Sequence, residues 1–207
     1  MTASQLIHHF EPGTDPSAPP VLLLHGTGGN EHDLLALGQS LAPGSALLSP
    51  RGPVSEHGAN RFFARLAEGR FDPAEVTART HQLADFVRDA AARHELDLTH
   101  LVAIGFSNGA NVAATLLQLR PEILGGGGVL LRPMVVLDQA AASATLTGRR
   151  VLLLNGTQDP IVPPDHPPRL RRLLEAGGAQ VEAQAFPAGH GLTSADVAAA
   201  RRFFARA

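Results

Sequence analysis

One stretch in the middle of the chain, residues 100–119, constrains the fold more than any other. An apolar, partly β-branched run at 101–104 is followed by the pentapeptide Gly105-Phe106-Ser107-Asn108-Gly109 and then by a segment of small, helix-forming residues. The first run predicts a buried parallel strand, and the last segment predicts a helix. The pentapeptide has the G-x-S-x-G pattern, in which a serine stands at the sharp turn between a strand and a helix. We therefore expect an α/β fold arranged around this turn.

The glycines at 105 and 109 indicate what the serine can do. A serine at a strand-to-helix turn has a strained backbone, and side chains at the flanking positions would clash with the neighbouring strand and helix. The strain exposes the hydroxyl above the carboxyl edge of the sheet, where N–H groups of the helix N-terminus face any negative charge that develops. We predict that Ser107 is a nucleophile. The alternative is a serine N-cap between two packing glycines.

The rest of the chain alternates predicted strands and helices. Predicted strands lie at 5–10, 21–24, 46–48, 129–131, 151–154 and 181–186, and predicted helices lie at 30–41, 72–90, 165–176 and 193–204. The long polar loop at 50–71 is of a length that usually has a function. This alternation predicts a single domain over residues 1–207, with a mostly parallel central sheet, helices on both faces and ligands bound outside the carboxyl ends of the strands.

Composition excludes several classes of protein. The 207 residues are 44% hydrophobic and contain no apolar run close to the roughly 20 residues of a membrane-spanning helix. The net charge of −2 is spread without blocks, which argues against binding to nucleic acid or to an anionic membrane surface. The N-terminus has neither a basic nor an apolar signal region, so we expect no signal peptide and a cytoplasmic location. The chain has no cysteine for a thiol nucleophile, and its histidine pairs lack a third metal ligand at a recognisable spacing. We expect neither a metal nor a cofactor.

A serine nucleophile needs a histidine base and a carboxylate on loops that leave later strands. The strand predicted at 151–154 leads to Asp159, and the strand predicted at 181–186 leads to His190 between two glycines. Either residue alone is more simply explained as a surface loop residue. Together with Ser107 they occur in the order Ser, Asp, His, which is the order of α/β-hydrolases. We predict this triad, with Asp138 as the second candidate for the acid.

A tetrahedral oxyanion needs two N–H donors. We predict the backbone of Asn108, the residue after the nucleophile, and the backbone of Thr27, in the glycine-rich loop after the strand at 21–24. His25 is expected to brace this loop. A dinucleotide fingerprint is the competing interpretation of the same loop, but Glu31 stands where the last glycine would be required.

Four segments together resemble the phospholipase/carboxylesterase family of α/β-hydrolases. These segments are Leu24-His25-Gly26-Thr27-Gly28-Gly29, the Gly105–Gly109 pentapeptide, Gly156-Thr157-Gln158-Asp159-Pro160-Ile161-Val162-Pro163 and Gly189-His190-Gly191. The Ser-Asn-Gly-Ala-Asn turn and Leu131-Arg132-Pro133-Met134 are most similar to the bacterial branch linked to hydroquinone resistance. The family also includes acyl-protein thioesterases, which have Ser-Gln-Gly where this chain has Ser-Asn-Gly. The resemblance covers nearly the whole chain and implies ester hydrolysis through an acyl-enzyme without a cofactor.

The substrate is less well defined by the sequence. No segment is long enough for a separate cap domain, which favours an open site and short- to medium-chain carboxylic esters. The predicted lining residues are Phe62, Phe63, Leu131, Arg132, Met134, Ile161 and Val162, and Arg51 or Arg132 is a candidate contact for an anionic leaving group. Thioesterase or lysophospholipase activity on the same triad, and a non-catalytic binding protein with this fold, remain alternatives. The sequence does not distinguish a monomer from a homodimer.

Overall fold

The computed structural model describes residues 6–205, so Gln5 of the first predicted strand and the N-terminal residues examined for a signal lie outside it. Within these residues, seven strands form one sheet in the order β1-β3-β2-β6-β7-β8-β9, in which only β1 runs antiparallel to its neighbour. The strands are β1 (His8–Glu11), β2 (Val21–Leu24), β3 (Leu47–Pro50), β6 (Val102–Phe106), β7 (Gly127–Leu131), β8 (Arg150–Gly156) and β9 (Gln180–Phe186). The helices are α1 (Leu35–Leu41), α2 (Pro73–His94), α3 (Asn108–Leu119), the 3-10 turn η1 (Pro121–Ile123), α4 (His166–Glu175) and α5 (Ser194–Phe204).

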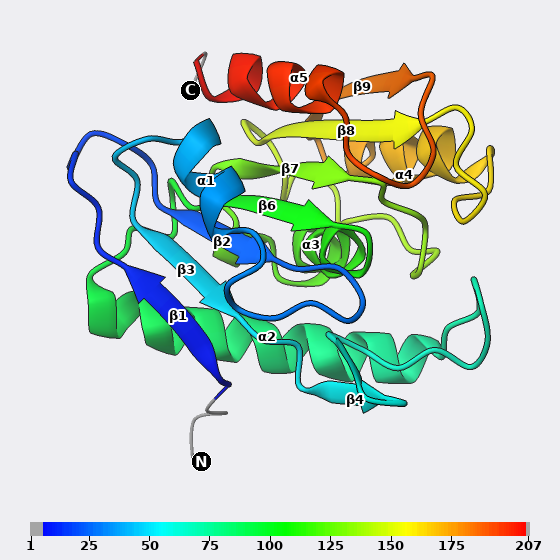
Figure 1. Ribbon diagram of the computed structural model, residues 1–207, viewed down its shortest axis with the longest axis horizontal. Coiled ribbons are helices and arrows are strands. Elements are labelled where there is room, and N and C mark those ends of the chain that lie inside the picture. The colour runs from blue at the N-terminus through cyan, green and yellow to red at the C-terminus, as the bar shows by residue number, and fades with distance from the viewer. Residues whose placement is uncertain (1–5, 206–207) are drawn as a thin grey trace.

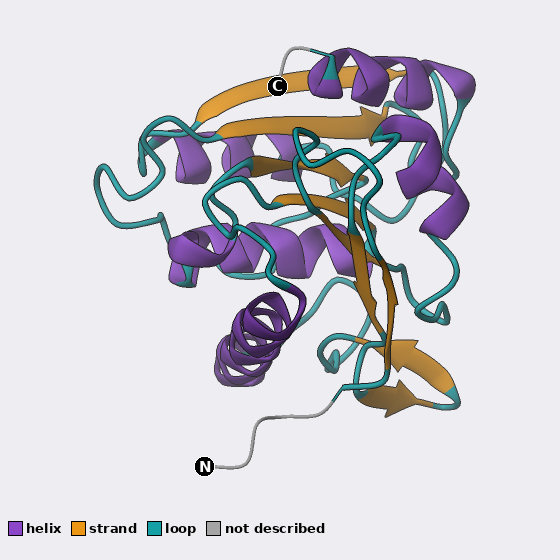
Figure 2. Cartoon of the chain, turned by 90° about the vertical axis from the view of Figure 1, so that its left-hand side faces the viewer, coloured by secondary structure: helices purple, strands orange, loops and turns teal. Residues whose placement is uncertain are grey.

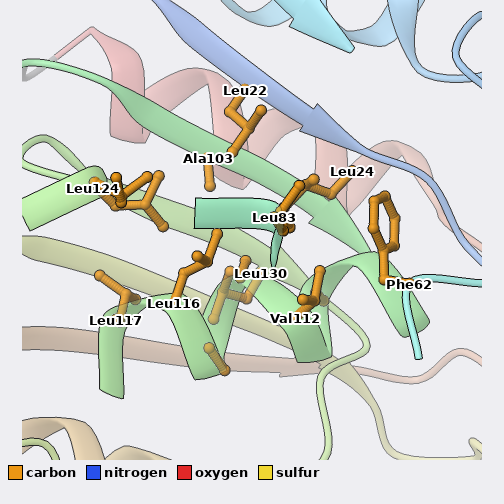
Figure 3. Close-up of a cluster of buried hydrophobic side chains, with 14 of the residues drawn as sticks. Leu22, Leu24, Phe62, Leu83, Ala103, Val112, Leu116, Leu117, Leu124 and Leu130 are labelled. Carbon is orange, nitrogen blue, oxygen red and sulfur yellow. The ribbon is translucent and has the colours of Figure 1, made fainter. Parts of the chain in front are cut away.

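Helices cover both faces of the sheet, as predicted. Helices α1 and α5 lie on one face, and α2, α3 and α4 lie on the other (Figures 1 and 2). Side chains alternate between the faces along each strand. In β2, Leu22 and Leu24 pack in the cluster formed with α2 and α3, whereas Val21 and Leu23 pack in the cluster formed with α1 and α5. Figure 3 shows the first cluster, in which Leu83 of α2 is drawn with side chains from the sheet and from α3. Because both faces are buried, the central strands consist almost entirely of apolar residues.

Helix α2 begins as its sequence predicts but runs four residues beyond the predicted end at residue 90. Asp72 precedes it, with a side chain that accepts a hydrogen bond from the Ala74 N–H at 2.9 Å, and Pro73 occupies the first helical position. Glu95 ends the helix in the left-handed conformation, with φ of 55°. This long helix packs beside α3 on the same face of the sheet.

Two local predictions are corrected by the structure. The helix predicted from Asn30 begins only at Leu35, because residues 31–34 form turns that lead from the glycine-rich loop. The predicted loop at 50–71 contains a two-stranded antiparallel hairpin, β4 (Val54–Glu56) and β5 (Ala59–Arg61). Its strands have only three residues each, too short for an alternating pattern to be detected. The hairpin turns the loop back towards the carboxyl edge of the sheet, where the candidate site lies.

No helix within residues 6–205 has the length and apolar character that crossing a membrane requires.

Candidate active site

The turn between β6 and α3 holds Ser107 in a strained conformation, with φ of 52° and ψ of −113°. A Cβ atom on Gly105 would lie 2.6 Å from the Gly109 carbonyl oxygen, and one on Gly109 would lie 1.9 Å from the Leu24 carbonyl oxygen. Both contacts are too short to exist, so the turn requires glycine at these positions. The Ser107 N–H donates to the Leu131 carbonyl oxygen at 2.8 Å, which ties the turn to β7. The serine hydroxyl is thereby fixed at the carboxyl edge of the sheet.

Three predicted residues from three separate loops form one hydrogen-bonded line at this edge. The Nε2 atom of His190 lies 2.8 Å from the Ser107 hydroxyl oxygen, and its Nδ1 atom lies 2.8 Å from Oδ2 of Asp159. The Asp159 side chain is 1% exposed, and its Oδ1 atom accepts N–H groups from Ile161 and Val162 at 2.8 and 3.3 Å. The loops after β8 and β9 carry the acid and the histidine, and these strands pair along their whole length. The geometry is that of a nucleophile, a base and a carboxylate that orients the base.

The second candidate acid does not reach this line. Asp138 is exposed, and its carboxylate accepts hydrogen bonds from Arg169 of α4, with Oδ1 3.0 Å from Nε. Its place on the surface therefore separates it from the histidine.

Two backbone N–H groups are available next to the serine hydroxyl. Thr27 and Asn108 line the same cavity as Ser107 and His190. Within residues 6–205 neither backbone N–H donates a hydrogen bond. The residue after Thr27 is anchored differently, because the Gly28 N–H donates to the Asn60 carbonyl oxygen at 2.9 Å. Free N–H groups beside a candidate nucleophile can receive an oxyanion.

The hairpin segment fixes both sides of this arrangement. Asn60 donates from its side chain to the Gly29 carbonyl oxygen at 2.8 Å, and Arg61 donates to the Thr27 hydroxyl. The next residue along the chain, Phe62, donates its N–H to the Asn108 side-chain oxygen at 2.8 Å. Three consecutive residues thus connect the glycine-rich loop with the nucleophile turn.

The cavity above Ser107 has a volume of about 410 Å³. Met134 and Ile161, both expected at the substrate site, line it. Six further lining residues were not predicted from the sequence: Arg61, Arg65, Glu68, Phe71, Phe106 and Asn111. The long loop at 50–71 is the only signal that could have indicated the first four.

Four of the predicted lining residues are core residues instead. Phe62 and Phe63 are 2% and 0% exposed and pack in the cluster beneath the sheet, where Figure 3 places Phe62 beside Leu24. Leu131 is 2% exposed and faces the opposite cluster, with α5. Arg132 is fully buried in an ion pair with Asp196. Aromatic and leucine side chains near a site gain more from burial in the core than from a position on a polar rim.

Two other predicted contacts also lie elsewhere. Val162 lines a separate cavity behind Asp159, between the loop after β8 and α4. Arg51 makes a bidentate ion pair with Glu31, at 2.5 and 2.6 Å, and does not line the cavity above Ser107. The cations that do line this cavity are Arg61 and Arg65, both held by Glu56.

His25 braces the glycine-rich loop, as expected. Its Nδ1 atom donates to the Gly26 carbonyl oxygen at 2.7 Å, and its Nε2 atom accepts the Gly52 N–H at 2.9 Å. An imidazole that donates at one nitrogen and accepts at the other is neutral. Burial lowers the pKa of His25 below its ordinary value of 6.5. Protonation would also break the hydrogen bond from Gly52.

Acid is therefore expected to destabilise the protein through His25. The pKa of His25 is lower in the folded state than in the unfolded state. The contribution of neutral His25 to the free energy of unfolding is therefore complete above pH 6.5 and is lost as the pH falls towards the folded-state pKa. Thermal unfolding at pH 7.5 and pH 5.0 measures this loss. The Tm of the wild type should fall further between these pH values than that of His25→Gln, which cannot titrate. Equal decreases in Tm for the two proteins would contradict the assignment.

No three His, Asp or Glu side chains within residues 6–205 gather in a group that could hold a metal ion.

Comparison with known proteins gives consistent matches over nearly the whole chain. The sequence profile of the phospholipase/carboxylesterase family matches residues 7–207. MhqD of Bacillus subtilis (strain 168), named as a hydrolase, is 40% identical over 200 residues, which are 97% of this chain and 98% of MhqD. The crystal structure of a Bacillus cereus carboxylesterase superposes with a TM-score of 0.93 at 41% identity, covering 97% of this chain and 94% of that one. A Mesorhizobium loti carboxylesterase superposes with a TM-score of 0.84 at 37% identity, covering 90% and 88% of the two chains.

Proposed function

Since the chain belongs to the phospholipase/carboxylesterase family and has the α/β-hydrolase fold, we propose that it is a serine carboxylesterase acting on short- to medium-chain carboxylic esters. The observation that carries the proposal is the hydrogen-bonded line from Ser107 through His190 to Asp159. A binding protein would have no physical need for all three groups in this geometry.

The reaction begins with proton transfer to His190. Its Nε2 atom takes the proton of the Ser107 hydroxyl as the serine oxygen attacks the ester carbonyl carbon. The Asp159 carboxylate keeps the other proton on Nδ1 and stabilises the imidazolium ion that forms. The same imidazolium then protonates the leaving alcohol, and the acyl group remains on the serine oxygen.

The carbonyl oxygen becomes negative in the tetrahedral intermediate. The free N–H groups of Thr27 and Asn108 donate hydrogen bonds to it, and the N-terminus of α3 adds its partial positive charge. Loss of one such donor typically lowers the rate by about 10²- to 10³-fold. Water repeats the sequence on the acyl-enzyme, with His190 as base and then as acid, and releases the carboxylic acid.

The cavity supports a small substrate. Its volume of about 410 Å³ is near the lower end of the range for small-molecule sites, and Phe71, Met134 and Ile161 supply apolar wall. Arg65 also lines the cavity, and its side chain is paired with Glu56, with Nε 2.6 Å from Oε1, and with Glu68. These features favour a short acyl chain and a compact alcohol over a long-chain lipid.

The proposal is tested by active-site labelling and turnover of the wild-type protein. A fluorophosphonate should form one covalent adduct per protein molecule, and peptide mapping should locate this adduct on Ser107. The protein should also hydrolyse p-nitrophenyl acetate and p-nitrophenyl butyrate. If the wild-type protein is neither labelled nor able to hydrolyse these esters, the proposal is overturned in favour of a non-catalytic binding protein with this fold.

A chain-length series separates the proposal from its enzymatic alternatives. We expect kcat/KM to be highest for acyl chains of two to about eight carbons in water, because the cavity is small. An optimum for long acyl chains at a lipid interface would indicate a lysophospholipase, and a preference for acyl thioesters over matched esters would indicate a thioesterase.

A further inference from the structure

We propose that the buried ion pair between Arg132 and Asp196 positions His190. The pair does so by holding the backbone of the loop on both sides of the histidine. The proposal rests on the esterase function above. It assigns to Arg132 a positioning role, in place of the substrate contact suggested by the sequence.

The ion pair is completely enclosed. The side chains of Arg132, after β7, and Asp196, in the first turn of α5, are both 0% exposed. The guanidinium group donates to both carboxylate oxygens, with Nη1 2.8 Å from Oδ1 and Nη2 2.7 Å from Oδ2. Oδ2 also accepts the N–H and the hydroxyl of Thr193, which fixes the start of α5. The carboxylate is therefore immobile, and it holds the guanidinium plane in one orientation.

The remaining guanidinium donors reach the residues on either side of His190. Nε donates to the Gly189 carbonyl oxygen at 3.1 Å, and Nη2 donates to the Gly191 carbonyl oxygen at 2.8 Å. Nη1 donates to the Leu154 carbonyl oxygen in β8 at 3.2 Å. All five N–H groups of the guanidinium are thus used, and two of them hold the histidine loop.

The backbone of this loop has few other hydrogen bonds. Within residues 6–205, the backbone groups of residues 189–191 make no hydrogen bond other than those two to Arg132. Gly189 and Gly191 also leave the backbone more freedom than other residues would. A Cβ atom on Gly191 would meet nothing within 4 Å, and one on Gly189 would meet only the Gln158 carbonyl oxygen at 3.9 Å. The backbone on both sides of His190 is therefore held by Arg132, while Asp159 orients the imidazole ring.

Arg132 also joins the loop to the other strands of the site. Its own N–H donates to the Leu154 carbonyl oxygen at 2.7 Å, and the preceding residue, Leu131, accepts the Ser107 N–H at 2.8 Å. Arg132 has a φ of 58°, in the left-handed region, which is unfavourable for a residue other than glycine. Leu131 and the strained Arg132 together thus connect the nucleophile turn, β8 and the histidine loop.

Stability alone does not explain a buried pair of this kind. Removing two charges from water is costly, and apolar residues of similar volume are often at least as stabilising. Arginine also supplies a planar set of five donors that lysine cannot reproduce. The geometry favours a function in positioning, since a small displacement of a catalytic group can lower the rate by about 100-fold.

The test compares two variants with the wild type. The double variant Arg132→Met/Asp196→Leu removes both charges together and leaves no unpaired buried ion, and Arg132→Lys keeps the charge but not the planar donors. We expect kcat for p-nitrophenyl acetate to fall by about 100-fold in each, with KM within about three-fold of the wild type. The rate of fluorophosphonate labelling should fall by a similar factor, because it also needs His190 as the base.

A matched control separates positioning from general destabilisation. Val87→Ala removes buried volume in α2, at a residue that does not line the cavity above Ser107, and should lower the Tm without changing kcat. Wild-type kcat in Arg132→Lys, or in a folded double variant, would overturn the proposal, as would an equal loss of kcat in the control. A wild-type protein that neither labels nor turns over would instead refute the esterase function on which the proposal rests.

Discussion

Replacing Ser107 with alanine is expected to lower kcat/KM for p-nitrophenyl butyrate by about 10⁴- to 10⁶-fold. Alanine keeps the Cβ atom and removes only the hydroxyl oxygen that lies 2.8 Å from Nε2 of His190. The residual activity would come from the free N–H groups and from substrate binding, which still favour attack by water. Steady-state kinetics and fluorophosphonate labelling measure the effect, and no adduct should form on the variant.

The control for this variant is Ser194→Ala. Ser194 is an exposed serine at the start of α5, at the same edge of the sheet, and its side chain makes no hydrogen bond in the described part of the chain. Its replacement should leave kcat/KM within about two-fold of the wild type. Both variants should unfold at nearly the wild-type temperature, because Ser107→Ala leaves the strained turn as it is. Substantial activity in a fully substituted Ser107→Ala sample would rule out a serine nucleophile at this position.

The site geometry could be predicted from the sequence because local requirements determine it. The turn around Ser107 needs glycine at two flanking positions, and clashes with the backbone of β2 and of the turn itself explain this requirement. Asp159 and His190 follow strands that run parallel and pair with each other, so the chain order of the motifs also places them at one edge. The motifs, the strands that precede them and the edge of the sheet at which those strands end therefore all predict the same site.

The walls of the site could not be predicted in the same way. Whether Phe62 faces a cavity or the core depends on how β4 and β5 turn the loop back, and their three-residue strands have no detectable periodicity. The partner of Arg132 lies 64 residues away in the sequence, in the capping turn of α5. A charged residue beside an active-site motif was therefore interpreted as a substrate contact, although its burial with Asp196 makes it part of the scaffold.

Replacing Asp159 with asparagine is expected to lower kcat by about 10⁴-fold with little change in the fold. The reason is the tautomer of His190. In the wild type, Oδ1 accepts two backbone N–H groups, from Ile161 and Val162, and Oδ2 accepts from Nδ1 of the histidine. The oxygen of an asparagine side chain must therefore stay in the Oδ1 position, which puts the NH₂ group opposite Nδ1. The histidine then has to accept at Nδ1 and carry its proton on Nε2, so it can no longer take the proton of the Ser107 hydroxyl.

A variant of Asp138, the exposed second candidate, tests which carboxylate is the acid. Asp138→Asn removes the second candidate, which pairs with Arg169 on the surface, and should change kcat by less than about two-fold. Fluorophosphonate labelling should slow in Asp159→Asn in proportion to kcat and stay at the wild-type rate in Asp138→Asn. The reverse pattern would move the acid to Asp138 and would require the loop after β7 to rearrange in solution. Asp159→Asn leaves the serine and the imidazole in place and changes only which nitrogen of His190 carries the proton. Loss of activity in this variant, but not in Asp138→Asn, would therefore show that Ser107, His190 and Asp159 operate as one unit.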